Sequence, residues 1–163
     1  MKKLLLIATN VDRYASGRLK TGLWLSELTH IYHSAMEKGW GITIASPKGG
    51  TVPIDPESLK PLVLDKISKG YYENPVFMDE LNHSKSLEAI KNDSFDCVYL
   101  SGGHGTMYDF PDDTTLQSVI SNQYEKGEMV AAICHGVGGL LNVKLSNGEY
   151  LIKGKTLTGL RKL

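Results

Sequence analysis

The chain of 163 residues fits one domain and is long enough to bury a hydrophobic core without disulfides or metals. Its 18 basic and 18 acidic residues leave no net charge, which argues against nucleic acid or an anionic membrane as a partner. No segment is long and apolar enough to span a membrane, and the first apolar run is too short for a signal peptide.

The first half of the chain alternates apolar runs with a helical pattern. Residues 3–8 form a continuous apolar run, which predicts a strand buried on both faces, and the polar residues 9–22 predict a loop at its carboxyl end. Apolar residues recur at helical spacing over 25–36, and Gly39 follows as a typical helix stop. Residues 42–46 predict the second strand.

The alternation continues in the second half of the chain. Residues 84–90 have the pattern of a short helix, and residues 95–100 predict the third strand. One side of residues 112–124 is apolar, which predicts a crossover helix, and the apolar run 130–133 predicts the fourth strand. Two further short strands are expected, at 150–152 and 155–158.

Strands that alternate with helices predict a parallel sheet with right-handed crossovers. We therefore expect a flavodoxin-like, doubly wound α/β fold with strand order 2-1-3-4, helices on both faces and one domain over residues 1–163. A further strand and helix would normally cover the last edge, so we expect a domain that is incomplete at its C-terminus. An open edge of this kind predicts pairing with a second copy, as a homodimer.

The two cysteines differ in their surroundings. Cys97 lies inside the third predicted strand, where an inert core thiol is expected. Cys134 ends the fourth strand, in the sequence Cys134-His135-Gly136, before helical spacing resumes. At such a corner the free N–H groups of the helix start should stabilise a thiolate, so Cys134 is predicted to be a nucleophile rather than one more buried hydrophobic residue. Free thiols indicate a reducing, cytoplasmic compartment.

A nucleophilic thiol needs a proton partner and donors for the oxyanion that forms on attack. Glu27, near the start of the first helix, and His135 are the candidate partners at the same sheet edge. The N–H groups of His135 and Gly103 are the expected oxyanion donors, because a glycine lets the backbone approach a substrate closely. Glu27 could instead be a salt-bridged surface acid.

The glycine-rich corner after the third strand also contributes Gly102 and His104 to the predicted substrate-binding residues. His104 could contact the substrate or hydrogen-bond the backbone of the corner. Glu27, His30 and His33 follow one another at three-residue intervals, but a helix turns their side chains apart over that length. We therefore predict no metal site.

Motifs spread along the whole chain support a more specific prediction. They are Thr21 to Glu27, Ser46 to Gly50, Asp55 to Ser58, Gly102 to Thr106 with Asp109, Ala132 to Gly136, and Gly154-Lys155 through Thr158-Gly159. In their order and spacing these motifs resemble the ThiJ/PfpI superfamily, within the class I glutamine amidotransferase-like fold. The similarity is greatest to its glyoxalase III and chaperone-deglycase branch.

The resemblance implies a cofactor-free enzyme in which Cys134 is the nucleophile, Glu27 is hydrogen-bonded to its sulfur and His135 is the general acid and base. The implied reaction converts methylglyoxal or glyoxal to lactate or glycolate without glutathione, or removes such adducts from glycated proteins. A stress-related holdase chaperone or other non-enzymatic interaction protein is the alternative. A cysteine amidase or peptidase is a weaker one.

Members of the superfamily continue past the position of Thr158-Gly159, whereas this chain ends with residues 160–163. By resemblance, the acidic partner of His135 would lie in that continuation. The chain therefore looks truncated, and we expect its turnover to be impaired.

Overall fold

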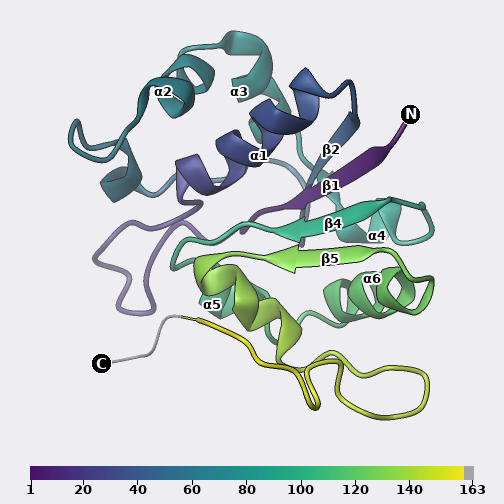
Figure 1. The fold of residues 1–163 in the computed structure, drawn as a ribbon. Helices are drawn as coiled ribbons and strands as arrows, with labels where there is room; N and C mark the ends of the chain where they lie inside the picture. The colour runs from purple at the N-terminus through teal and green to yellow at the C-terminus, as the bar shows by residue number, and fades with distance from the viewer. Residues whose placement is uncertain (160–163) are drawn as a thin grey trace.

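The computed structural model describes residues 1–159, which fold around a parallel five-stranded sheet (Figure 1). The strands stand in the order β3-β2-β1-β4-β5, and each pairs in parallel with its neighbours. Their bounds are β1 Lys3–Ile7, β2 Gly41–Ser46, β3 Lys85–Ser86, β4 Cys97–Leu100 and β5 Met129–Ala132. The predicted α/β fold and the order 2-1-3-4 are confirmed by β2-β1-β4-β5, and β3 adds an edge strand that the sequence did not predict.

The helices cover both faces of the sheet, with α1, α2 and α3 on one side and α5 and α6 on the other (Figure 1). Their bounds are α1 Leu25–Glu37, η1 Pro56–Leu59, α2 Lys66–Tyr72, α3 Pro75–Asn82, α4 Leu87–Ile90, α5 Thr106–Asp109, α6 Thr114–Glu125 and η2 Cys134–Leu140. Here η1 and η2 are 3₁₀ helices. None of the helices in residues 1–159 has the length and hydrophobicity that a bilayer span requires.

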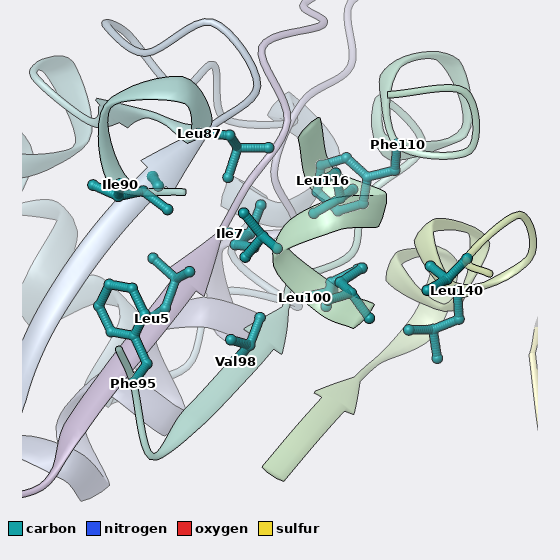
Figure 2. Packing of buried hydrophobic residues seen from close by; sticks show 14 of the residues in the cluster. Leu5, Ile7, Leu87, Ile90, Phe95, Val98, Leu100, Phe110, Leu116 and Leu140 are labelled. Atoms are coloured by element: carbon teal, nitrogen blue, oxygen red, sulfur yellow. The ribbon is translucent and has the colours of Figure 1, made fainter. Parts of the chain in front are cut away.

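The strand β1 supplies both halves of the hydrophobic core, because successive side chains point to opposite faces of a sheet. Leu5 and Ile7 pack with α4, α6 and η2, as Figure 2 shows for Leu87, Leu116 and their neighbours. Leu4 and Leu6 pack on the other face, against α1 and α3. Burial on both faces explains why this strand is a continuous apolar run in the sequence.

Two local predictions were wrong. Residues 84–90 do not form one helix, because Lys85–Ser86 pair with the end of β2 before α4 begins at Leu87. The expected strands at 150–152 and 155–158 are absent from the described chain, where residues 151–154 form turns that end at Gly154 with a φ of +71°. The prediction that residues 160–163 replace the continuation seen in the superfamily concerns residues outside the described part of the chain.

Candidate active site

The corner after β5 carries Cys134 in a strained backbone conformation. Its φ of +53° is the one positive value of a non-glycine residue in residues 1–159. The chain turns there directly into η2, and a Cβ at Gly136 would lie 2.5 Å from the carbonyl oxygen of Leu100. Such strain costs about 1 to 3 kcal/mol and is typical of functional corners. The structure therefore has the strand-to-helix corner that the sequence predicted, with the thiol at its tip.

The backbone N–H groups of His135 and Gly103 lie near the sulfur of Cys134 and act to lower the pKa of its thiol. Gly103 reaches this position from the corner after β4, with a φ of +107°. A Cβ at Gly103 would lie 2.0 Å from the carbonyl oxygen of Gly22, so only glycine fits. The structure brings both predicted oxyanion donors to the sulfur, and their role in catalysis stays a prediction.

Glu27 approaches the same sulfur from the first turn of α1. Its carboxyl group lies beside the Cys134 side chain and the N–H of Gly102, and both act to lower its pKa. The hydroxyl of Tyr99, on β4, donates to the backbone carbonyl of Glu27 at 3.0 Å and so fixes the start of the helix. The Oε2 atom is buried without a hydrogen-bond partner in the described part of the chain, and no salt bridge of Glu27 occurs within residues 1–159. The alternative of a salt-bridged surface acid is therefore wrong.

Gly102 makes this contact possible because it has no side chain. A Cβ at this position would lie 2.3 Å from Oε2 of Glu27 and 2.8 Å from Cβ of Cys134. The acid and the thiol therefore meet across the backbone of the corner after β4.

Burial raises the pKa of the Cys134 thiol, and the nearby Glu27 raises it further. The two N–H groups act to lower this pKa, in the direction that the sequence predicted, but burial and Glu27 outweigh them. Burial also raises the pKa of Glu27. Burial thus favours the neutral form of both the thiol and the carboxyl, and the two N–H groups oppose this effect at the sulfur.

The ring of His135 also lies next to the sulfur. Its Nδ1 atom is 3.5 Å from Sγ of Cys134, which is its one side-chain hydrogen-bond partner within residues 1–159. Burial lowers the pKa of His135, and the neighbouring His104 lowers it further. A neutral imidazole can accept a proton, as the predicted acid/base role requires.

His104 follows Gly103 and packs against His135, with the two ring centroids 4.5 Å apart. Its Nδ1 atom is buried without a hydrogen-bond partner in the described part of the chain. The alternative in which the His104 side chain hydrogen-bonds the backbone of the corner is wrong, since no such bond occurs within residues 1–159. On its other side His104 contacts the ring of Tyr14, a residue that the sequence did not single out.

The metal hypothesis for α1 fails on geometry. Glu27 faces Cys134, whereas Nε2 of His30 lies 3.0 Å from Asp65 and Nδ1 of His33 lies 3.1 Å from the hydroxyl of Tyr71. Three side chains with three different partners do not converge on one ion.

A cavity of about 170 Å³ opens at the sulfur. Apolar groups dominate its walls, and the segment after residue 150, yellow in Figure 1, returns to it. Its lining residues are Met107, Cys134, His135, Val137, Gly138, Leu141 and Gly159. The reacting groups therefore face a space suited to a small molecule.

Asp109 anchors the loop 9–22 beside this site. Its carboxyl group accepts hydrogen bonds from the hydroxyl of Thr9 at 2.9 Å and from the N–H of Asn10 at 2.8 Å. Burial nevertheless raises the pKa of Asp109 to about 6. The sequence contained this residue only as part of a motif, because no local pattern reveals its burial.

We expect Asp109→Asn to remove a pH dependence of stability. With a pKa near 6 in the folded state and the lower ordinary value in the unfolded state, Asp109 binds a proton on folding between these values. Its stabilising effect is full below about pH 4 and is lost as the pH rises through about 6, on the order of 2 to 3 kcal/mol. Urea unfolding of wild type and variant from pH 4 to 7 measures the difference. Asp12→Asn, at an exposed position, is the matched control, and a slope that Asp109→Asn retains contradicts the prediction.

The fold and site define a class of protein, an α/β domain with a thiol at the corner after its last strand and an acid from its first helix. The sequence profile of the DJ-1/PfpI family matches residues 19–160. The chain belongs to the DJ-1/PfpI family, as its motifs predicted.

Three similar proteins illustrate the relationship. Glyoxalase 3 of Candida albicans is 34% identical over 98% of this chain and 69% of its own length. Glutathione-independent glyoxalase HSP31 of Saccharomyces cerevisiae is 32% identical over 97% of this chain and 68% of its own. The structure of Rapid Encystment Protein 24 KDa of Francisella tularensis is 39% identical, with a TM-score of 0.89 over 95% of this chain and 68% of that one. The chain thus spans about two thirds of the length of these relatives.

Proposed function

We propose that the protein is a cysteine-dependent, glutathione-independent glyoxalase that converts a small α-oxoaldehyde such as methylglyoxal to its hydroxy acid. The observation that carries the proposal is the surroundings of Cys134, whose sulfur has two N–H donors, the carboxyl of Glu27 and the ring of His135 around it. The names of the two curated relatives described above support the same activity.

The reaction begins when the thiolate of Cys134 attacks the aldehyde carbon and forms a hemithioacetal. The N–H groups of His135 and Gly103 adjoin the sulfur and can donate to the oxygen that becomes negative. Glu27 carries the proton that the thiol released, and can return it to that oxygen.

His135 then moves a proton between two neighbouring carbons. Its Nδ1 lies 3.5 Å from the sulfur, so a carbon bonded to that sulfur is within reach of the ring. The ring removes the proton from the attacked carbon while the neighbouring carbonyl oxygen takes up a proton, which gives an enediol. The ring then returns its proton to the adjacent carbon while the hydroxyl group on the attacked carbon loses its proton, which gives a thioester and a new hydroxyl group. Water hydrolyses the thioester to the hydroxy acid and frees the thiol.

The cavity favours a small substrate with a short apolar group. Its volume of about 170 Å³ and the side chains of Met107, Val137 and Leu141 suit the methyl group of methylglyoxal. A glycated side chain would present the same carbonyl carbons to Cys134, and repair of glycated proteins is a second use of this chemistry.

The test mixes purified protein with methylglyoxal in the absence of glutathione and follows D-lactate. Lactate formation that saturates with substrate supports the proposal. Consumption of methylglyoxal without lactate, or no consumption by protein whose circular dichroism shows an intact fold, contradicts it.

A further inference from the structure

Three aromatic rings form a chain that ends at the proposed acid/base. The ring centroids of Tyr14 and His104 are 5.3 Å apart at an angle of 45°, and those of His104 and His135 are 4.5 Å apart at 40°. These rings come from the loop 9–22, the corner after β4 and the corner after β5. Three separate segments of the chain therefore meet through them.

An acid/base imidazole works only when its ring is held in one plane and in one tautomer. Within residues 1–159 the side chain of His135 has one hydrogen bond, at 3.5 Å to the sulfur that it serves. A single hydrogen bond at one ring atom leaves the imidazole free to tilt about that contact. The packing of the His104 ring against that of His135 is a second restraint on it.

Hydrogen bonds hold the backbone on both sides of His104. The neighbouring Gly103 is confined by the chain at Gly22, and its carbonyl accepts the N–H of Thr106 at 3.3 Å and the Thr106 hydroxyl at 2.9 Å. The carbonyl of His104 itself accepts the N–H of Met107 at 3.1 Å. His104 is thus held at the start of α5.

Tyr14 is held from its own side of the chain. Its N–H donates to the carbonyl of Leu19 at 3.0 Å, and its carbonyl accepts the N–H of Gly17 at 2.7 Å. Residues Arg13 and Lys20 pair beside it as an antiparallel bridge. The Tyr14 ring that contacts His104 therefore belongs to a hydrogen-bonded turn.

We propose that His104, supported by Tyr14, is a positioning residue that holds the ring of His135 in place and disfavours its protonation. The proposal rests on the acid/base role of His135 in the proposed function. A second imidazole at 4.5 Å opposes a positive charge on the first, and the pKa of His135 is indeed lowered by burial and by His104. Among residues 1–159, the titratable groups that contact the two rings include Cys134 and Tyr14, and Glu27 lies next to Cys134.

Two substitutions distinguish the effect of the packing of the His104 ring from the effect of its nitrogen atoms. His104→Ala removes the ring, and we expect kcat to fall by about 10- to 100-fold with KM changed less than threefold. His104→Phe restores a flat ring without nitrogen atoms, and we expect it to recover most of kcat, with the acid limb of the pH profile moved to higher pH. His83→Ala, at an exposed histidine of the segment after α3, is the matched control.

An NMR titration of the imidazole of His135 in the same variants gives a readout that does not depend on turnover. We expect its pKa to rise in both variants relative to wild type, because the neighbouring imidazole is gone. The proposal is overturned if His104→Phe is as inactive as His104→Ala, if His104→Ala keeps wild-type kcat, or if His135 titrates as in wild type. Wild-type protein that makes no lactate would contradict the proposed function, and the titration would still decide the effect of His104 on His135.

Discussion

Cys134→Ser is expected to reduce lactate formation from methylglyoxal by at least about 1000-fold. A hydroxyl at the corner after β5 keeps the N–H donors and the Glu27 contact, but it ionises far less readily than a thiol and is a poorer nucleophile. Steady-state kinetics with a coupled D-lactate assay measures the loss, and the unfolding midpoint shows that the fold is intact.

The matched control for this variant is Cys97→Ala, which changes the buried thiol of β4. Alanine leaves no polar group without a partner in the core, and the thiol lies inside the strand rather than at the corner. We expect near wild-type turnover from Cys97→Ala, with some loss of stability. Cys134→Ser that keeps more than a tenth of the activity would exclude a covalent role for this residue.

Gly102→Ala is expected to reduce kcat by about 100-fold although it replaces no reacting group. The new methyl group would lie 2.3 Å from Oε2 of Glu27 and 2.8 Å from Cβ of Cys134, so the acid and the thiol must separate. The rate of Cys134 alkylation by iodoacetamide as a function of pH should change as well, since Glu27 no longer contacts the sulfur. Both measurements use the folded variant, checked by circular dichroism.

Gly70→Ala is the matched control, because a Cβ at Gly70 meets no atom within 4 Å and its φ is not positive. Alanine is favoured over glycine inside a helix such as α2, so this variant should be at least as stable as wild type and fully active. If Gly102→Ala turned over at the wild-type rate, the close approach of Glu27 to Cys134 would be unimportant for catalysis.

The parts of the fold that follow a regular pattern of apolar residues could be predicted from the sequence. Alternating apolar runs and helical spacing predicted the four longer strands and their order, and the Cys-His-Gly sequence predicted the corner at Cys134. The strand β3 has two residues, too few for any periodicity to show. Residues 150–158 have strand-forming side chains, but successive turns and Gly154 prevent a strand there.

The electrostatics of the site could not be predicted in the same way. The raised pKa of the Cys134 thiol depends on burial and on Glu27, which is distant in the sequence. The contact of Tyr14 with His104 comes from a loop without periodicity, so no pattern of residues singles out Tyr14. The homodimer and the cytoplasmic location stay predictions.

The register of the sheet determines the relative positions of the two corners that form the site. Leu100 pairs with Ile7 on one side and with Ala132 on the other, so β1, β4 and β5 end at the same height. The two corners that carry Gly103 and Cys134 begin from this common level, and a slip of one residue would turn the flanking side chains to the opposite face. Strand pairing therefore sets the distance between the nucleophile and the N–H donor. The loops that follow can differ in sequence without moving the reacting atoms.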